Sequence, residues 1–404
     1  MKNTSKKQPP YAGFEQGPTR PPSEAASLLI RITRNCPWNR CIFCQIHRDN
    51  TFSLRPVDHV LMDIDTIHRH VGLIRKVIGG PGKITRDHIL ALTAWTEPDE
   101  LKVLNAALHW ARDGMRTIFL QDANSLIIKP RDLISILTHL RKRFPWVERI
   151  TSYASSHTLA RIDDRDLNQI AAAGLNRIHI GMESGSNKVL AMVNKGVDRE
   201  VHVQAGLKVK RAGMELSVYV MPGLGGKALS HSHAAETADM LNRINPDFIR
   251  LSTLAMPTHP WNLKQLGREN FVRQNDREIA LELLFLLEDL KGITSTVHSN
   301  HMLNLFEDME GTFPQDQEKM IAIAQEFLGM PVDEQVLYQV GRRIGFFTGL
   351  RDLQDPIKRA RAEKTCSYHG IGPDNVDAAI SKMMKNFFKL ETAATAIPTL
   401  IPAL

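Results

Sequence analysis

Short apolar runs alternate with longer amphipathic stretches between residues 27 and 262. Each run is rich in Ile, Val, Leu, Thr or Tyr, and most are nearly continuously apolar, as strands buried on both faces are. The stretches between them show helical periodicity, and Gly174 and Gly213 mark the ends of two of these. The predicted strands are 27–35, 117–123, 149–155, 177–183, 215–223 and 248–254.

Strands that alternate with helices at this spacing predict βαβ crossovers and a parallel sheet, that is, an α/β fold. Six strand–helix units fit before residue 262. The first two strands lie far apart in the sequence, so we expect two helices between them. The helices expected in this part of the chain are 56–78, 98–113, 130–143, 164–174 and 199–213.

Beyond residue 262 the pattern changes to a mostly helical C-terminal region, with one more strand expected at 293–298. The helices predicted there are 277–290, 316–329 and 373–390. We therefore expect three parts: a flexible N-terminal arm (1–26), the α/β part (27–262) and the helical C-terminal region (263–404).

Charge is distributed unevenly along the 404 residues. The net charge is +7, but residues 1–262 carry +11 and the remainder carries −4. A basic front half is compatible with nucleic-acid binding or with a solvated surface, and the sequence shows no nucleic-acid motif. The polar, Pro-rich start is not a signal peptide, and the apolar end is too short to cross a membrane. We expect a cytoplasmic protein without membrane contact.

Three of the four cysteines form a C-x4-C-x2-C motif directly after the first predicted strand: Cys36, Cys41 and Cys44. Three thiolates on one short loop suit zinc or an iron–sulfur cluster and indicate a reducing compartment. Structural zinc normally needs four protein ligands, for which His47 and the distant Cys366 are the candidates. Three ligands on a four-iron cluster leave one iron open.

The cysteine loop, with Phe43 just before its third cysteine, resembles the cluster loop of the radical S-adenosylmethionine (radical SAM) superfamily. The usual spacing there is C-x3-C-x2-C, one residue shorter. The resemblance covers about 27–262 and is greatest to the branch of elongator-type tRNA-modifying and coproporphyrinogen-type enzymes. It implies a partial (β/α)6 TIM-like barrel with parallel strands, followed here by the mostly helical region.

The resemblance also implies SAM contacts. After the second strand, Asp122 stands where the family has a residue that meets the methionine amine, and Ser155 after the third strand can meet the methionyl end. Phe43 and the backbone at Leu254 would flank the adenine.

Later in the chain, Glu183 matches the ribose-binding position and Lys195 the partner of the SAM carboxylate. Gly223 and Gly225 would allow the backbone to approach the ligand closely. From the residues alone, Glu183 can instead cap a helix, Lys195 can be solvated, and the glycines can form a plain turn.

The function that the resemblance implies is reductive SAM cleavage at a [4Fe-4S] cluster, giving a 5′-deoxyadenosyl radical that abstracts hydrogen from a substrate. It also implies an external one-electron donor of flavodoxin or ferredoxin type. Two alternatives remain: a tRNA-modifying radical SAM enzyme, or a non-catalytic iron–sulfur or zinc protein.

Four arginines lie on or beside the cysteine loop: Arg31, Arg34, Arg40 and Arg48. They would stabilise a reduced cluster or select an anionic substrate, or be solvated in part. Strand alternation predicts separate roles for Arg31 and Arg34.

Elsewhere, Cys366 is expected to be a structural thiol, with hydrogen donation as the alternative. His298, His301 and Asn304 form a His-rich stretch in which the last two would share a helix face. Core or capping roles are favoured over catalysis for this stretch.

Overall fold

The computed structural model describes residues 10–79, 83–257, 259–268 and 270–384. The chain divides into two compact units. Unit 1 comprises 1–37, 49–179 and 211–215, and unit 2 comprises 38–48, 180–210 and 216–404. The cysteine loop is divided between them after Pro37.

Unit 1 is built on parallel strands β1 (Leu28–Arg31), β4 (Thr117–Gln121) and β5 (Arg149–Tyr153), with the start of β6 (Arg177–Glu183) beside β5. Most of the apolar residues of these strands are buried, as expected for strands covered on both faces. A small antiparallel pair, β2 (Thr33–Arg34) and β3 (Ser53–Leu54), flanks the start of the cysteine loop.

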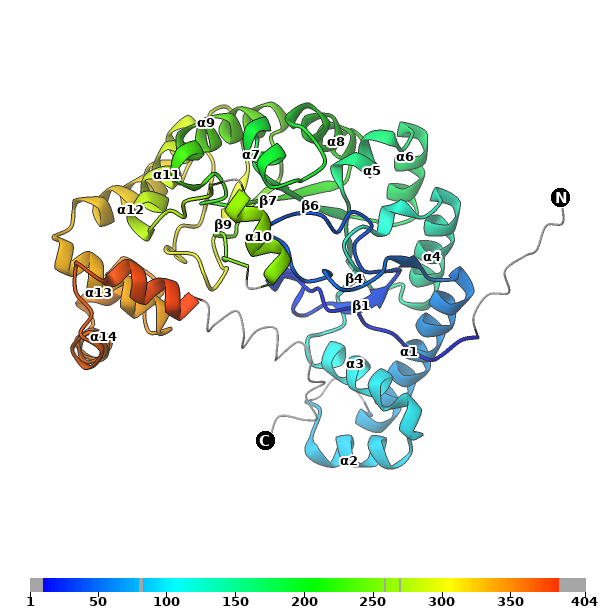
Figure 1. The fold of residues 1–404 in the computed structure, drawn as a ribbon. Helices are drawn as coiled ribbons and strands as arrows, with labels where there is room; N and C mark the ends of the chain where they lie inside the picture. The colour runs from blue at the N-terminus through cyan, green and yellow to red at the C-terminus, as the bar shows by residue number, and fades with distance from the viewer. Residues whose placement is uncertain (1–9, 80–82, 258, 269, 385–404) are drawn as a thin grey trace. The chain divides into compact units, whose positions relative to one another are not determined.

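The helices of unit 1 follow these strands, and α1, α3 and α4 pack together (Figure 1). Helix α1 buries Val60, Ile64, Ile67, Val71 and Ile74, a spacing of three and four residues. The helices are α1 (Val57–Ile78), α2 (Arg86–Ala94), α3 (Leu101–Arg112), α4 (Pro130–Arg143), α5 (Ser156–Arg161) and α6 (Asp164–Ala172), with 3-10 turns η1 (Pro22–Glu24), η2 (Pro98–Glu100) and η3 (Ser125–Ile127).

In unit 2, β7 (Glu215–Val220), β8 (Phe248–Leu251) and β9 (Thr296–His298) are parallel, and β10 (Gly311–Thr312) pairs antiparallel with β9. Helix α11 packs on both α9 and α12, and α13 packs on α14. The helices are α7 (Asn187–Met192), α8 (Arg199–Arg211), α9 (Gly226–Ile244), α10 (Pro260–Arg268), α11 (Asp276–Asp289), α12 (Gln317–Gly329), α13 (Val332–Arg343) and α14 (Pro356–His369), with the 3-10 turn η4 (Leu350–Gln354).

The sheet confirms the α/β fold class. Its strand order is β1-β4-β5-β6-β7-β8-β9-β10, mostly parallel, and each of the six predicted strands is present, as is the strand expected at 293–298. The region after residue 262 is mostly helical, as predicted. Residues 376–384 of the helix predicted at 373–390 are helical, and 385–390 lie outside the described residues.

Three expectations were wrong. Helix α2 was not predicted, because only Ile89 and Leu92 of its nine residues are buried and its apolar pattern is short. Residues 301–304 form a turn in place of a helix, with Asn304 N donating to His301 O at 2.9 Å. The described part of the arm, from residue 10, is held within unit 1 by hydrogen bonds such as Tyr11 Oη to Asp63 Oδ1 at 2.7 Å. The boundaries at 27 and 263 stay predictions.

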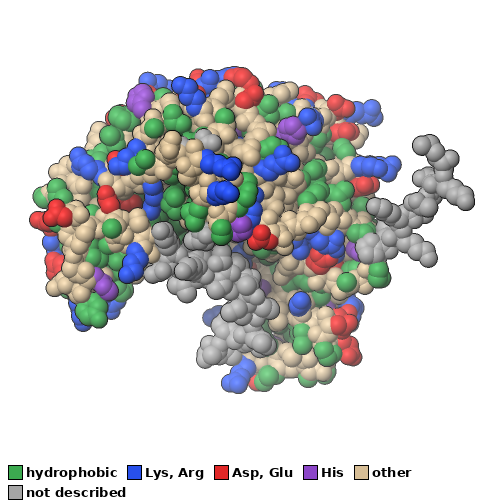
Figure 2. All heavy atoms as spheres, viewed as in Figure 1, with side chains coloured by type: hydrophobic (Ala, Val, Ile, Leu, Met, Phe, Trp, Pro, Cys, Tyr) green, Lys and Arg blue, Asp and Glu red, His purple; other side chains and the backbone are tan. Residues whose placement is uncertain are grey.

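Two surface properties bear on partners. On the face in Figure 2, Lys and Arg side chains are interspersed with Asp and Glu, so the basic excess does not form one continuous patch on this face. Among the described residues, no helix is long and apolar enough to span a membrane.

Candidate functional site

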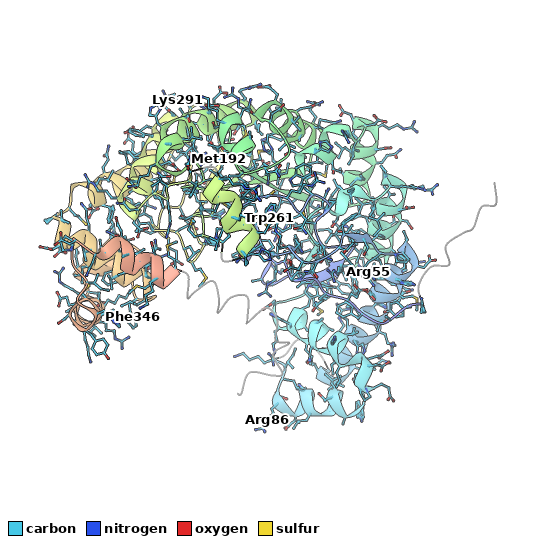
Figure 3. The ribbon with its side chains drawn as sticks, in the orientation of Figure 1. Arg55, Arg86, Met192, Trp261, Lys291 and Phe346 are labelled. Carbon is cyan, nitrogen blue, oxygen red and sulfur yellow. The ribbon has the colours of Figure 1, made fainter. Side chains whose placement is uncertain are left out.

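The part of the cysteine loop in unit 2 is fastened by an arginine. The Arg48 guanidinium donates to the carbonyl oxygens of Asn39 at 2.5 Å, Cys41 at 2.8 Å and Cys44 at 3.1 Å. The Cζ atom of Arg48 lies 4.0 Å from the centroid of the Trp261 ring, and Trp261 belongs to α10 (Figure 3). A planar fork with five N–H donors suits this task. Arg48 therefore holds the loop backbone, and the solvated interpretation of this residue was wrong.

Helix α10 and the end of α7 also hold this loop. Asn262 Nδ2 of α10 donates to the carbonyls of Ile42 at 2.5 Å and Cys44 at 2.9 Å. After α7, Val193 O accepts from Ile42 N at 2.9 Å. These contacts hold the loop through its backbone and not through the cysteine thiols.

Glu183 and Lys195 form an ion pair beside this loop. Lys195 Nζ lies 3.0 Å from Glu183 Oε1, and 5.6 Å from the centre of the Phe43 ring. Glu183 has a left-handed backbone (φ 68°), and a side chain at Gly181 would place its Cβ 2.3 Å from Glu183 Oε1. Gly181 therefore leaves the room that this carboxylate occupies.

The charge of Lys195 links this pair to the cysteines. Burial lowers the pKa of Lys195, but the Glu183 carboxylate and the thiolates of Cys41 and Cys44 outweigh it, so the pKa is raised. The ammonium group is thus positive and lies within electrostatic reach of two thiolates. A cation here is suited to an anionic ligand next to the cysteine loop.

Phe43 and Leu254 belong to one apolar cluster. The buried members are Val189, Val193, Leu224 and Leu254, and Phe43 packs against them. This brings together the two residues expected to flank an adenine ring.

Backbone conformation and close packing explain why glycine occupies two positions after β7. Gly223 has a φ of 85°, and its N–H donates to the buried Glu282 at 2.7 Å. A Cβ at Gly225 would lie 3.0 Å from Leu229 O, because α9 begins immediately afterwards. Both positions form a tight turn at the start of α9, which is compatible with ligand approach.

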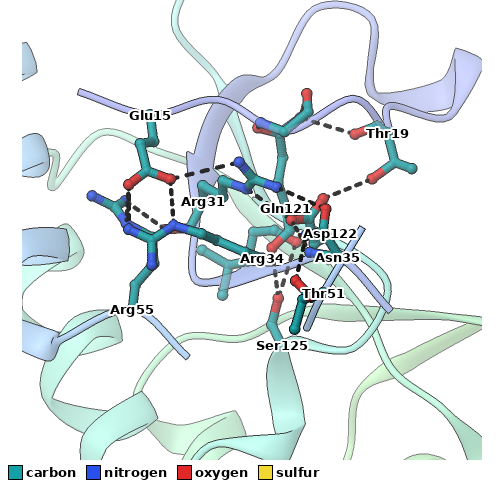
Figure 4. A network of polar contacts seen from close by, with 12 residues as sticks. Glu15, Thr19, Arg31, Arg34, Asn35, Thr51, Arg55, Gln121, Asp122 and Ser125 are labelled. Carbon is teal, nitrogen blue, oxygen red and sulfur yellow. Dashed lines mark hydrogen bonds and ion pairs between the residues drawn. The ribbon is translucent and has the colours of Figure 1, made fainter. Parts of the chain in front are cut away.

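In unit 1, Asp122 is the centre of a polar network (Figure 4). Its fully buried carboxylate accepts from Arg31 Nε at 2.8 Å, from Asn35 N at 3.0 Å and from Thr19 Oγ1 at 3.4 Å. Asn35 directly precedes Cys36 and has a left-handed backbone (φ 67°). Asp122 therefore holds the chain at the start of the cysteine loop, and its acceptor sites are largely taken by the protein itself.

Glu15, from the N-terminal segment, completes this network. It accepts from Arg34 Nε at 2.8 Å and lies 3.5 Å from both Arg31 Nη1 and Arg55 Nε. Hydrogen bonding to Arg34 lowers the pKa of Glu15. Arg31 and Arg34 thus share Glu15 as a partner, and Arg31 also binds Asp122, so the separate roles predicted for the two toward a cluster or a substrate stay a prediction.

Ser155 caps a helix. Its Oγ accepts from Thr158 N at 3.3 Å at the start of α5 and from Asn124 Nδ2 at 3.2 Å. These contacts explain a small hydroxyl residue there without a ligand.

The other singled-out side chains lie in structural surroundings. Asn304 Oδ1 accepts from Thr253 N at 2.8 Å, and its amide donates to Leu251 O at 2.9 Å. His298 stacks on Phe248 with a centroid separation of 5.9 Å. Burial lowers the pKa of His301 to about 4 and raises that of Cys366. These contacts favour the core roles expected for the stretch.

The donor set fits an iron–sulfur cluster. The three loop cysteines are half-buried and not disulfide-bonded, and Cys44 N donates to Cys41 O at 3.3 Å, so two of them share one turn. Within the described ranges, no three His, Cys, Asp or Glu side chains, the loop cysteines included, are gathered as a ready metal site, so the fit rests on the type and spacing of the donors. Three thiols and a flanking cation suit a cluster with one open iron.

The sequence did not predict that Arg48 holds the loop backbone. It also did not predict the contacts of Asn262 and Glu15. Asn262 lies 218 residues along the chain from Cys44, and Glu15 lies 19 residues from Arg34 in a segment taken for a flexible arm. Neither has a local motif. The only signal for Arg48 was its place just after the third cysteine.

Comparisons with known proteins place the chain in a family. The family model described as the radical SAM superfamily matches residues 30–238, just over half of the chain. Over 244 residues the chain is 27% identical to a tRNA uridine(34) acetyltransferase of Methanocaldococcus infernus, which covers 57% of this chain and 42% of that relative. The chain thus spans less than half of that relative's length.

Two solved structures are also similar. Coproporphyrinogen III oxidase from Escherichia coli has a TM-score of 0.43 at 16% identity, covering 65% of this chain and 52% of that one. The radical S-adenosylmethionine methyltransferase TsrM from Kitasatospora setae has a TM-score of 0.40 at 13% identity, covering 60% and 37%. On the family match, the chain belongs to the radical SAM superfamily, an enzyme family whose members bind a [4Fe-4S] cluster and S-adenosylmethionine.

Proposed function

We propose that this enzyme binds SAM between the Cys41–Cys44 turn and the Glu183–Lys195 pair, and cleaves it reductively to initiate hydrogen abstraction from a substrate. Cys36, Cys41 and Cys44 would hold the cluster. When bound, the cluster supplies one electron from an external donor, and SAM supplies the 5′-deoxyadenosyl radical.

The observation that carries this proposal is the position of the ion pair. A carboxylate with acceptor capacity, a lysine with N–H donors to spare and the ring of Phe43 lie beside a turn bearing two thiols. Glu183 would accept from the ribose hydroxyls, Lys195 would bind the SAM carboxylate, and Phe43 would contact the adenine. Gly223 and Gly225 would let the backbone approach the ligand.

Two further predicted contacts have less support. Asp122 already accepts from three donors of the chain, and Ser155 is engaged as a helix cap. We therefore assign both a positioning role around the site, and direct SAM contact by Asp122 and Ser155 remains the alternative.

The test is anaerobic reconstitution followed by a count of iron and an assay for 5′-deoxyadenosine after reduction with dithionite. We expect about four irons per chain and SAM-dependent product. Glu183→Ala should lose most product, whereas Glu200→Ala, on the exposed face of α8, should not. A full iron content with no product in the wild type would favour a non-catalytic iron–sulfur protein.

Modification of tRNA is the second candidate, favoured by the similarity to a tRNA-acting relative and by the basic front half. Binding of tRNA that weakens steeply as salt rises, with a slope reflecting several phosphate contacts, would support it. Binding that is equally weak at low salt would point to another substrate, such as a small anionic molecule.

A further inference from the structure

Unit 2 contains a buried polar cluster that contacts two turns to which the proposed function assigns SAM binding. These are the Glu183 turn and the Gly223 turn. We name the polar cluster the His233 cluster; it consists of Ser184, His233, Thr237 and Glu282. Ser184 directly follows Glu183 at the end of β6, and Thr237 shares α9 with His233. All four side chains are less than 4% exposed.

His233 connects the two turns. Its Nδ1 lies 2.8 Å from Ser184 Oγ, and its Nε2 lies 3.1 Å from the carbonyl oxygen of Met221 at the end of β7. A carbonyl can only accept, so Nε2 carries the proton. In the neutral imidazole Nδ1 then accepts from the Ser184 hydroxyl, whose oxygen in turn accepts from Ser186 N at 2.9 Å. Thr237 Oγ1 also lies 3.4 Å from Nδ1, so both hydroxyls of the cluster face this acceptor.

Glu282 of α11 holds the second turn. Its Oε1 accepts from Gly223 N at 2.7 Å and its Oε2 from Ser230 Oγ at 2.7 Å. His233 Nε2 lies 3.7 Å from Oε1, so the carboxylate also faces the imidazole. A buried carboxylate with these partners fixes the backbone at Gly223.

The backbone between the turns depends on the same contacts. Met221 N donates to Glu183 O at 3.0 Å, and Thr237 Oγ1 accepts from Gly185 N at 2.9 Å. Glu183 has a φ of 68°, an unfavourable conformation for a residue with a side chain, which persists only where its surroundings enforce it. The His233 cluster provides that enforcement.

Serine, histidine and glutamate together also suggest a hydrolytic triad, but the arrangement does not support one. Ser184 is fully buried, and the cavity beside His233 and Glu282 measures about 10 Å³, room for about one water. No substrate carbonyl fits there, so the cluster serves the backbone.

We propose that His233 and Glu282 are positioning residues that hold the Glu183 turn and the Gly223 turn at the separation SAM requires, without touching SAM. This inference rests on the proposed function for its ligand, and on the hydrogen bonds above for the coupling between the turns.

The experiment uses three variants of the full-length enzyme. His233→Ala removes both imidazole contacts, His233→Asn keeps a polar atom near Ser184, and His233→Gln keeps a donor near the Met221 carbonyl. His70→Ala is the matched control, because His70 is equally buried but bonds to Glu100 in unit 1. Amide hydrogen exchange is measured without SAM, and SAM affinity by calorimetry on reconstituted enzyme.

We expect faster exchange at residues 183–186 and 221–223 in His233→Ala and roughly 10-fold weaker SAM binding, the loss typical when an orienting partner is removed. His233→Asn and His233→Gln should each have an exchange rate and a SAM affinity between those of His233→Ala and the wild type. They also allow the test to be made if His233→Ala does not fold. The control should change neither.

Unchanged exchange at both turns would overturn the inference, whatever SAM does. Faster exchange with wild-type SAM affinity would also overturn it, because the turns would then be coupled without consequence for the ligand. Failure of the proposed function is distinguishable, since it shows as absent SAM binding in the wild type itself.

Discussion

Asp122 and Glu183 are two acidic residues at the ends of parallel strands, and they differ in what their carboxylates do. Both have left-handed backbones, with φ 87° and 68°, and both are buried. Asp122 accepts from Arg31, Asn35 and Thr19. For Glu183, the donor that the described structure provides is Lys195.

The difference indicates that a carboxylate can bind a ligand only where the donors of the protein leave some of its hydrogen-bond acceptor sites unused. A carboxylate has about four lone-pair sites. The protein's own donors fill most of them at Asp122, whereas Glu183 keeps several. Two acidic residues at the ends of parallel strands can therefore differ in role: Asp122 holds the chain, whereas we propose that Glu183 binds the ligand.

The largest expected effect concerns the cysteine loop that both residues adjoin. Changing Cys36, Cys41 or Cys44 to Ala should each abolish the visible absorbance and most of the iron of reconstituted enzyme, because a four-iron cluster held by two thiolates is unstable. Cys366→Ala is the control and should keep both. Full iron content in Cys41→Ala would exclude this loop as the cluster site.

The next effect is on stability. Asp122→Ala leaves the Arg31 guanidinium, whose side chain is only 13% exposed, without its main partner. Breaking a buried pair typically costs about 3–5 kcal/mol. Urea unfolding should show a loss of this size, and Glu183→Ala a smaller one. Equal losses for the two variants would mean that Glu183 is also a scaffold residue.

A substitution of Lys195 tests the proposed binding role of the Glu183–Lys195 pair. Lys195→Gln should weaken SAM binding by roughly 10–150-fold, the equivalent of about 1.5–3 kcal/mol for one charge-assisted hydrogen bond. Lys188→Gln, an exposed lysine on α7, should leave the affinity unchanged. Similar affinities for both variants, measured by calorimetry, would return Lys195 to a purely structural ion pair.

The smallest effect is expected at the helix cap. Ser155→Ala should cost about 1 kcal/mol of unfolding free energy, the usual value for a lost N-cap. SAM affinity should stay the same, since the Ser155 hydroxyl is engaged with Thr158 and Asn124. A drop in SAM affinity well beyond the drop in stability would restore the predicted methionyl contact.

The sequence was sufficient for the fold class because its signals are local. The strand at 177–183 carries Ile178, Ile180 and Met182 at every second position, and the helix at 130–143 begins and ends where its pattern does. Helix α2 was not predicted, because a short helix with two buried residues shows little apolar periodicity in the sequence. The turn at 301–304 escaped because spacing of three residues fits a turn as well as a helix.

The site was only partly predictable, because residue type and strand position do not reveal hydrogen-bond partners. Glu183 and Lys195 are 12 residues apart, and a motif could suggest their pairing. The donors to Asp122 come from 87 to 103 residues away. No local pattern records such contacts, so the predicted ligand role of Asp122 could be weighed only in the fold.

The most direct measurement is the SAM affinity of Asp122→Asn and Glu183→Gln, determined side by side by calorimetry on reconstituted enzyme with equal iron content. Each variant keeps the shape of the side chain and removes its charge. We expect Glu183→Gln to bind SAM at least 10-fold more weakly than the wild type, as for one lost charge-assisted hydrogen bond, and Asp122→Asn to bind it within about twofold. The reverse result, weak binding in Asp122→Asn and wild-type affinity in Glu183→Gln, would contradict the distinction between the two carboxylates.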